Sequence, residues 1–292
     1  MRGAQLAELG SPPAPAEVDE PQPESGDVLV RVEAVALNPL DLAVGAGRFY
    51  GGHPPLPYAP GCEAVGRTEE GGLVYLFGDG RGVGKPGFLA ERVAVPADLP
   101  LPVPDGTDPA LAAAAGIAGI AGWVSVAWRA KPTPEDRVLV LGGTGTVGGL
   151  AAQAARLLGA SRVVAVGSSD LGRIGEEFGD EGFTVCIDPV WGEPLANALA
   201  YAAPHARIVH VGQSAAPESP LRSADVRGKE LTITGHSNFA LTKQERDRAY
   251  IELLDHLVAG RIELELQTFQ LEDVAAAWTN QRGGKSVILI SA

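Results

Sequence analysis

The sequence predicts an α/β protein: a doubly wound parallel sheet with β-rich segments before and after it in the chain. From Arg137 onward, short apolar runs alternate with helical segments, which is the pattern of parallel strands joined by helical crossovers. A glycine-rich turn joins the first of these strands to the first helix. The first hundred residues instead hold short alternating strands separated by Pro and Gly, and a similar pattern returns near the C-terminus.

The N-terminal segment is predicted to be mostly β-structure. Strands are expected over residues 27–37, 73–77 and 88–95, with Pro-rich connections at 12–23 and 54–60. The loop 78–87 resembles a phosphate-binding P-loop only in composition. Asp79 stands where that motif needs Gly, and Pro86 stands where it needs Ser or Thr, so the metal-binding hydroxyl is missing.

Between the two β-rich segments, residues 109–128 carry no charge over about the length that spans a bilayer. Ala and Gly dominate this segment and give little transfer free energy into lipid. Asp108 and Pro109 form a helix N-cap and first helical position. We therefore expect a helix packed inside a water-soluble protein, and no membrane partner.

The middle of the chain predicts the parallel sheet. We expect strands at 137–141, 162–166, 184–188, 207–211 and 231–234, and helices at 146–158, after Asp170 and at 194–202. Ligands bind outside the carboxyl ends of the strands in such a sheet.

The C-terminal part begins with the capping box Thr242-Lys-Gln-Glu245, which predicts a helix to Ala259 that ends at Gly260. A strand over 262–269, a short helix from Leu271 and a strand over 286–290 follow. Because β-rich sequence returns here, we predict one discontinuous domain, 1–108 with 236–292, and an inserted nucleotide-binding domain, 109–235. The cleft between domains is the expected reaction site.

Three glycines after the strand 137–141, Gly143, Gly145 and Gly148, stand at the G-x-G-x-x-G spacing of dinucleotide sites. They allow a tight turn, close backbone approach to a pyrophosphate and close packing of the helix on the strand. The free amides at the start of the helix would then face the phosphates.

The end of the next strand favours NADP(H) over NAD(H). An NAD site usually has Asp or Glu there, which binds the ribose 2′-hydroxyl. Here Gly167 takes that position, and the hydroxyls of Ser168 and Ser169 with the nearby Arg173 could accept a 2′-phosphate. Asp170 keeps the alternative open, because a shift of a few residues in the alignment would make it the ribose-binding acid.

Composition excludes several classes of protein. A formal net charge of −13 and the lack of any Lys or Arg run argue against nucleic-acid binding. Two cysteines, Cys62 and Cys186, cannot form a disulfide framework or a four-cysteine zinc lobe. No charged-then-apolar leader stands at the N-terminus, so a cytoplasmic location is expected.

The order of motifs along nearly the whole chain resembles the zinc-independent quinone oxidoreductases of the medium-chain dehydrogenase/reductase superfamily. The matching segments are Ala36-Leu-Asn-Pro-Leu-Asp41, Arg48-Phe-Tyr50, Leu56-Pro-Tyr-Ala-Pro-Gly-Cys-Glu63 with Gly66, Gly87-Phe-Leu-Ala-Glu91, Pro96-Ala-Asp98, Leu101-Pro-Val-Pro-Asp-Gly106, the glycine turn, and Gly284-Lys285. The segment between Gly66 and Phe88 is shorter than in typical members. The resemblance therefore does not predict the shape of the entrance to the substrate site.

The resemblance implies a GroES-like β-domain built from both chain ends, plus a Rossmann domain. It implies NADPH as the reductant, a quinone or α,β-unsaturated carbonyl as the small-molecule substrate, and a homodimer. The expected cofactor-binding residues are Asn38, Gly143, Thr144, Gly145, Thr146, Val147, Gly148, Gly167, Ser168, Ser169, Arg173, Val211, Gly212, Gly235 and Lys285.

Zinc-using relatives place Cys where Asn38 stands and His where Cys62 stands. An amide and a lone thiol make a poor zinc site, which normally needs three protein ligands with N or S donors, so no metal is expected. Asn38 and Tyr50 are then the expected catalytic residues, because an amide and a phenol can donate hydrogen bonds to a carbonyl oxygen. Two alternatives remain open: a zinc-assisted alcohol dehydrogenase or carbonyl reductase that uses Cys62, and an NADPH-binding protein without turnover.

Overall fold

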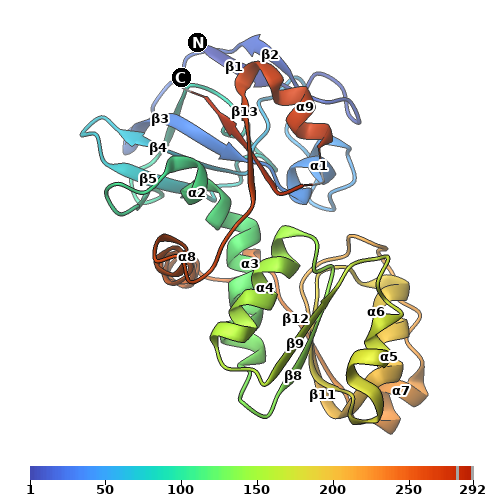
Figure 1. The fold of residues 1–292 in the computed structure, drawn as a ribbon. Helices are drawn as coiled ribbons and strands as arrows, with labels where there is room; N and C mark the ends of the chain where they lie inside the picture. Colours follow the sequence, from blue (N-terminus) through green and yellow to red (C-terminus); the bar gives the residue numbers. More distant parts are fainter. Residues whose placement is uncertain (281–282, 291–292) are drawn as a thin grey trace. The chain divides into compact units, whose positions relative to one another are not determined.

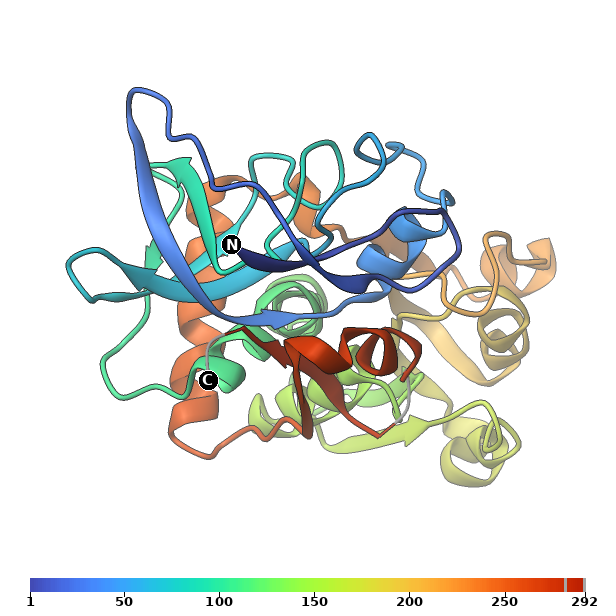
Figure 2. The same ribbon diagram turned by 90° about the horizontal axis from the view of Figure 1, so that it is seen from above.

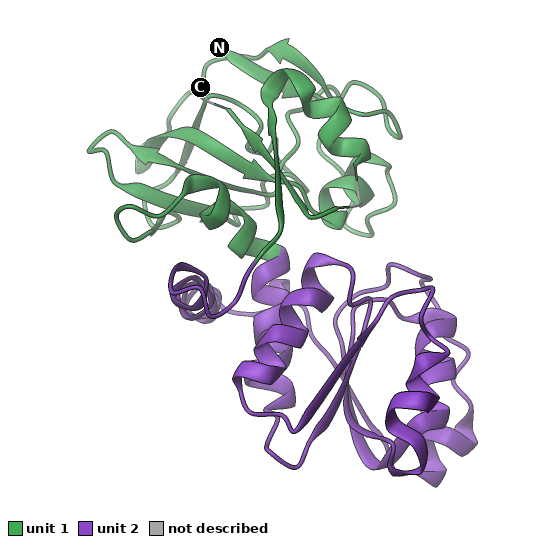
Figure 3. Ribbon diagram, viewed as in Figure 1, with its two compact units in different colours: residues 1–117, 264–292 green, residues 118–263 purple. Residues whose placement is uncertain are grey.

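The computed structural model describes residues 1–280 and 283–290. The chain folds into two compact units, Met1–Ile117 with Leu264–Ala292, and Ala118–Glu263 (Figure 3). The discontinuous β-rich unit and the inserted α/β unit match the predicted fold class. The boundaries differ from the predicted 108/109 and 235/236, because the helix over 243–258 packs against the segment after residue 118 and belongs to the second unit.

The first unit is mainly β-structure (Figure 1). Its strands are β1 Arg2–Gln5, β2 Ala14–Glu17, β3 Asp27–Ala36, β4 Glu63–Thr68, β5 Leu73–Phe77, β6 Arg92–Pro96, β7 Leu101–Pro102, β13 Leu266–Gln270 and β14 Lys285–Leu289. Its helices are α1 Pro39–Gly45, α2 Pro109–Ala114 and α9 Val274–Thr279, the last preceded by a 3₁₀ turn at Leu271–Asp273.

Strand β3 is the centre of the large sheet in this unit. It pairs antiparallel with β4, β6 and β14, in a sheet of order β13-β14-β3-β4-β5-β7. Val30, Val32 and Val35 of β3 are fully buried in a core that also contains Leu76 and Ile288. Both chain ends therefore contribute strands to one hydrophobic core, which explains why this unit is discontinuous in sequence.

The second unit contains the predicted parallel sheet. Its strands are β8 Arg137–Leu141, β9 Arg162–Val166, β10 Phe183–Asp188, β11 Ala202–His210 and β12 Thr232–Gly235. Its helices are α3 Ile120–Val124, α4 Thr146–Leu157, α5 Arg173–Phe178, α6 Gly192–Ala198, α7 Ser223–Gly228 and α8 Lys243–Val258, with 3₁₀ turns at Gly179–Glu181, Leu199–Tyr201 and Asn238–Ala240 and a π-helical turn at Ser125–Ala130.

The sheet order is β12-β11-β10-β8-β9, and every pair is parallel. Counted along the unit, this is the 2-1-3-4-5 order of the doubly wound folds. Helices α3 and α4 cover one face, and α5, α6 and α7 cover the other (Figure 1). The strand order reverses between β8 and β10, so the ligand crevice is expected at their carboxyl ends.

The apolar segment 109–130 is helical and meets the length and hydropathy criteria for a membrane span, but 78% of its most apolar window is buried inside the protein. The helix is kinked at Gly116, whose ψ of −123° lies outside the helical region. In the second unit this segment continues as α3, against which α8 packs. Helix α8 is seen lengthwise in Figure 2. The segment therefore behaves as a core helix.

Two predicted strands are shorter than expected. The strand predicted over 88–95 is β6, which begins only at Arg92, because the amides of Phe88 and Leu89 bond the carbonyls of Gly61 and Pro60 instead of a strand. The strand predicted over 262–269 is β13, which begins at Leu266 and pairs with β14. The capping box is as predicted: Thr242 and Glu245 bond each other's backbone N–H groups.

The two glycines Gly148 and Gly149 in the first turn of α4 offer a matched test of helix packing. A Cβ at Gly148 would lie 2.3 Å from the carbonyl oxygen of Gly142, whereas a Cβ at Gly149 would meet nothing closer than 3.5 Å. We expect Gly148→Ala to lower the free energy of unfolding by about 1–3 kcal/mol through overpacking. Gly149→Ala should be neutral or stabilising by up to about 1 kcal/mol, because Ala is the better helix former. Urea denaturation of both variants measures this, and equal stabilities would contradict the close approach.

Candidate functional site

The glycine turn lies at the carboxyl end of β8, where the parallel sheet places its ligand crevice. Gly142 has a φ of +63°, and the N–H of Gly143 donates to the carbonyl of Val166 on β9. A Cβ at Gly143 would lie 2.6 Å from Ala165. Helix α4 begins directly after Gly145 without a side-chain cap, so its first amides are left for a ligand.

The end of β9 lies beside this turn, as the parallel pairing of the two strands requires. A Cβ at Gly167 would be 3.1 Å from Thr144, which places the second strand end against the turn. Ser168 and Ser169 are exposed. The Ser169 hydroxyl donates to Asp170, and the Asp170 carboxylate lies 3.7 Å from the Cβ position of Gly167. An acid therefore does stand close to the position where NAD-binding sites place one.

The Arg173 side chain pairs with a carboxylate of its own helix. Its guanidinium bonds Glu177 at 2.9 Å, one helical turn away, and Glu177 also accepts from Arg162 at 2.7 Å. Arg162 begins β9, at the opposite end of the strand from Ser168. In this arrangement the Arg173 guanidinium is paired with Glu177, and binding of a 2′-phosphate there would require it to leave an exposed ion pair, which costs little.

Val211 and Gly212 follow the end of β11, and Gly235 is the last residue of β12. The Val211 N–H donates to the carbonyl of Asp188, and a Cβ at Gly212 would lie 2.9 Å from the carbonyl oxygen of Pro189. The structure therefore brings the predicted cofactor residues of the second unit together at one sheet edge. The other two predicted cofactor residues, Asn38 and Lys285, belong to the first unit, where both are buried.

In the first unit, the sheet pairing brings three chain segments together at one point. Asn38 follows the carboxyl end of β3, while Glu63 and Lys285 begin β4 and β14, which run antiparallel to β3. All three side chains are buried, with exposed fractions of 1%, 0% and 4%. Together with Tyr75 of β5 we call them the buried polar cluster. Glu63 and Tyr75 were not among the predicted site residues, and polar side chains in otherwise apolar strands were the available signal.

Hydrogen bonds occupy every polar atom of Asn38 and Glu63. Asn38 Nδ2 donates to the carbonyl of Ala36 at 3.2 Å and to Glu63 Oε1 at 2.8 Å, and Asn38 Oδ1 accepts from Lys285 Nζ. Glu63 Oε2 accepts from the Tyr75 hydroxyl at 2.7 Å and from the Ile117 N–H at 2.5 Å. The kink at Gly116 brings this last amide close to Glu63. The approach requires glycine, because a Cβ at position 116 would lie 1.7 Å from Glu63 Oε2.

This arrangement bears on two of the predicted site residues. Both amide hydrogens of Asn38 are used inside the unit, so the amide has no hydrogen left to donate to a carbonyl substrate. Lys285, predicted to bind cofactor, is buried and lies 3.8 Å from Glu63 Oε1 as its ion-pair partner. Both residues organise the interior because adjacent strand ends place them against the Glu63 carboxylate.

Burial acts on both charges of the ion pair. It raises the pKa of Glu63, opposed by the charge of Lys285 and by the hydrogen bonds of Asn38, Tyr75 and Ile117. Burial likewise lowers the pKa of Lys285, opposed mainly by the charge of Glu63. Each charge is therefore tolerated in the interior because the other is present.

Cys62 and Asp41 form a second buried pair beside this cluster. The Asp41 carboxylate accepts from the Asn38 N–H at 2.7 Å and from the Cys62 N–H at 2.8 Å, so it joins the start of α1 to the segment before β4. Burial and the charge of Asp41 raise the pKa of the Cys62 thiol well above its usual value, so the neutral thiol is the stable form. Within the described residues, no group of three or more His, Cys, Asp or Glu side chains could hold a metal ion.

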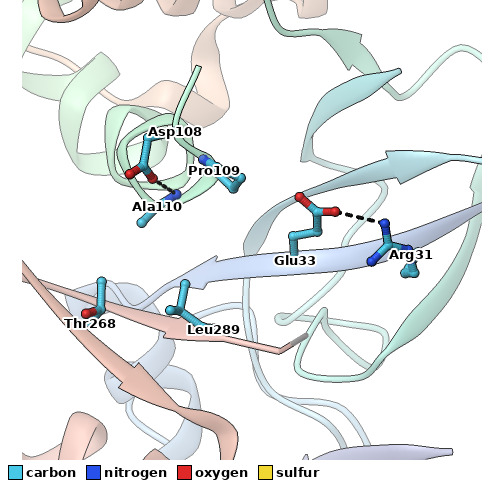
Figure 4. Close-up of a pocket in the computed structure, with 7 residues that line it drawn as sticks. All are labelled: Arg31, Glu33, Asp108, Pro109, Ala110, Thr268 and Leu289. Atoms are coloured by element: carbon cyan, nitrogen blue, oxygen red, sulfur yellow. Dashed lines mark hydrogen bonds and ion pairs between the residues drawn. The ribbon is translucent and has the colours of Figure 1, made fainter. Parts of the chain in front are cut away.

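Tyr50, the second predicted catalytic residue, lies after α1 in a loop. It is 90% exposed, and its ring lies against that of Phe49 in a tilted arrangement at a centroid distance of 4.4 Å. It is not part of the buried polar cluster, and its phenol remains available to a ligand. A separate pocket in the first unit is lined by the Arg31–Glu33 ion pair and the Asp108 N-cap of α2 (Figure 4). No predicted site residue lines this pocket.

Comparison with known proteins identifies the class of protein. Residues 24–105 match the family model of the alcohol dehydrogenase GroES-like domain, and residues 158–287 match that of zinc-binding dehydrogenases. The two models together cover most of the chain, in the order that the two units require. The chain therefore belongs to the medium-chain dehydrogenase/reductase superfamily, with a GroES-like unit and a Rossmann unit.

Within this superfamily the chain is similar to quinone oxidoreductases. It is 28% identical to the quinone oxidoreductase of Rattus norvegicus over 84% of this chain and 82% of the relative, and 28% identical to that of Lama guanicoe over 99% and 98%. The quinone oxidoreductase of Thermus thermophilus, whose structures include a complex with NADPH, matches with a TM-score of 0.83 at 27% identity, covering 99% of this chain and 100% of that one.

The buried ion pair can be tested with Lys285→Met. Removing the ammonium leaves Glu63 without its countercharge, and we expect a loss of about 3–5 kcal/mol in the free energy of unfolding. In the variant the pKa of folded Glu63 rises further above its unfolded value, so Glu63 must become protonated on folding. The loss should therefore be smaller at about pH 5 and grow toward about pH 8.

The double variant Lys285→Met with Glu63→Gln is the control for this prediction. It removes both charges, so we expect it to be more stable than Lys285→Met near neutral pH and to lose the added pH dependence. Chemical denaturation of the wild type and both variants across the pH range measures this. Equal stabilities of the single and double variants at every pH would contradict the ion pair.

Proposed function

We propose that this protein is an NADPH-dependent reductase that transfers hydride to a quinone or an α,β-unsaturated carbonyl compound without zinc. The observation that carries the proposal is the pairing of a glycine turn at the switch point of the parallel sheet with a first unit whose metal-ligand positions hold an amide and a protonated thiol. Similarity to quinone oxidoreductases over nearly the whole chain supports the same class of reaction.

The residues at the carboxyl edge of the second unit fit a dinucleotide. A Cβ at Gly143 would meet Ala165 of β9 at 2.6 Å, and a Cβ at Gly148 would meet Gly142 of the turn at 2.3 Å, so the close packing needed for phosphate approach depends on glycine there. The turn and the start of α4 would hold the pyrophosphate, and Ser168 and Ser169 would hold the 2′-phosphate. When bound, NADPH supplies the hydride.

The first unit does not fit a catalytic zinc ion. A zinc site needs about three N, S or O donors with the thiol deprotonated. Here the Cys62 thiol is held neutral beside Asp41, and Asn38 is bonded to Glu63 and Lys285. These contacts support zinc-independent chemistry, in which the protein polarises the substrate through hydrogen-bond donors.

Tyr50 is the residue we assign to donate a hydrogen bond to the substrate oxygen, because its phenol is exposed. Asn38 is assigned a positioning role. Its amide fixes the end of β3 and the start of α1, the helix that precedes the Tyr50 loop. We further propose that the enzyme works as a homodimer in the cytoplasm, which gel filtration and cell fractionation would test.

The proposed reaction predicts NADPH oxidation by the purified protein with at least one member of a panel of quinones and enones. Treatment with EDTA, or with an excess of Zn²⁺, should leave the rate unchanged, because no metal takes part. Tyr50→Phe should lower kcat by about tenfold or more, since it removes one hydrogen bond to the developing charge. Phe49→Leu, in the same loop, is the matched control.

The outcomes separate the rival functions. Sensitivity to EDTA that Zn²⁺ restores would favour a zinc-assisted dehydrogenase using Cys62. Tight NADPH binding without turnover of any substrate in the panel would favour a binding protein. Equal rates for Tyr50→Phe and the wild type would overturn the catalytic assignment of Tyr50.

Cofactor preference gives a separate prediction. The Asp170 carboxylate beside Gly167 repels a 2′-phosphate, so Asp170→Asn should increase the ratio of kcat/KM for NADPH over NADH by about threefold to tenfold. Ser168→Ala should change the ratio in the opposite direction. An unchanged ratio in both variants would place the 2′-phosphate away from this strand end.

A further inference from the structure

A cluster of side chains at the carboxyl edge of the parallel sheet is not used by the proposed reaction. Asp188 ends β10 and His210 ends β11, and the two residues are direct register partners in the parallel pair. Trp191 follows Asp188 in the loop before α6. We propose that these three residues, the Asp188 cluster, bind the nicotinamide mononucleotide half of NADP(H) through the His210 imidazole. The inference rests on the proposed function.

Asp188 is a buried carboxylate with one oxygen left for the imidazole. Its exposed fraction is 0%, and Oδ1 accepts from the N–H groups of Val190 and Trp191 at 3.0 and 2.9 Å. Oδ2 is also buried and has no hydrogen-bond partner among the described residues. His210 Nδ1 lies 3.5 Å from it. Nδ1 likewise has no hydrogen-bond partner among the described residues, and because an unpaired buried carboxylate oxygen is costly, a small movement of the imidazole toward Oδ2 would satisfy both atoms.

The His210 ring therefore presents its other nitrogen outward. Nδ1 is buried toward Asp188, while the side chain as a whole is 28% exposed. The tautomer that satisfies Asp188 carries the proton on Nδ1, which leaves Nε2 as an acceptor. Such a nitrogen can accept a hydrogen bond from a ribose hydroxyl.

Trp191 covers one side of the His210 ring, and the backbone of Trp191 is itself in a strained conformation. The indole packs against the imidazole in a tilted arrangement, with a centroid distance of 4.1 Å. Its φ of 60° and ψ of −163° lie in a region that essentially only glycine adopts, at a cost of about 1–3 kcal/mol. Strain of this kind concentrates at ligand sites. The backbone here is bent so that Trp191 can bond Asp188 through its N–H and cover His210 with its ring.

The cluster is continuous with the predicted cofactor residues. Val190 would lie 2.8 Å from a Cβ at Gly142 of the glycine turn, and Pro189 would lie 2.9 Å from a Cβ at Gly212. A dinucleotide crosses this kind of sheet at the switch point between β8 and β10. With the adenosine half over β9, the other half extends over β10 and β11. His210 stands on that second side.

The test compares ligands that carry different halves of the cofactor. We expect His210→Leu to raise the Kd for NADPH by about tenfold, which is about 1.4 kcal/mol, and to leave the Kd for 2′,5′-ADP unchanged, because that probe carries only the adenosine half. His210→Gln should lose less affinity, since its amide can still form a hydrogen bond. Reduced nicotinamide mononucleotide alone should bind more weakly to His210→Leu than to the wild type.

His205→Leu is the matched control. His205 lies on the same strand β11, is 74% exposed and pairs with Glu230 at 3.2 Å, but it lies toward the opposite end of the strand from His210. Its replacement should change neither Kd. Trp191→Phe is a second variant that keeps an aromatic cover, and it should retain NADPH affinity within about threefold. Thermal unfolding confirms that each variant is folded.

Equal NADPH affinities of folded His210→Leu and His205→Leu would overturn the inference. A parallel loss of affinity for NADPH and for 2′,5′-ADP in His210→Leu would overturn it as well, because it would place His210 in the adenosine half or in the fold. Failure of the folded wild type to bind NADPH would overturn the proposed function itself. Isothermal titration calorimetry or quenching of Trp fluorescence supplies each Kd.

Discussion

The first unit depends on the buried carboxylate of Glu63. Four groups from four different segments point at it: the amide of Asn38, the hydroxyl of Tyr75, the N–H of Ile117 and the ammonium of Lys285. Since each of these donors would be costly to bury alone, their segments are held in register by a single group. The carboxylate thus joins the end of β3, the start of β14, strand β5 and the kinked helix.

The same contacts limit what chemistry the first unit can perform. Zinc-using relatives need ligands at the positions of Asn38 and Cys62, but here these residues are committed to the interior. The Asn38 amide bonds Glu63 and Lys285, and the Cys62 thiol is kept neutral by burial and by Asp41. In the proposed reaction the hydrogen bond to the substrate comes from outside this interior, and we assign it to the exposed Tyr50.

In the second unit, the segments at the carboxyl edge of the sheet are joined by close approach of their backbones rather than by a buried charge. Gly142, Gly148 and Gly212 each lie where a Cβ would meet a neighbouring loop at under 3 Å. The loops after β8, β10 and β11 therefore form one continuous layer at the carboxyl edge of the sheet. The strained Trp191 and the buried Asp188 belong to this layer, which places the stored strain beside the expected cofactor rather than in the core.

The sequence alone determined the fold class, the parallel strands β8 to β12 and the glycine turn, because these features depend on local periodicity and on glycine spacing. It also indicated that the first unit uses both chain ends. Tertiary structure decided the unit boundaries, the saturation of Asn38, the ion pair of Lys285 and the orientation of Arg173 toward Glu177. These depend on which strand ends lie side by side, and no local pattern records that. His210 and Asp188 lie more than twenty residues apart in the sequence and meet only through the register of two parallel strands.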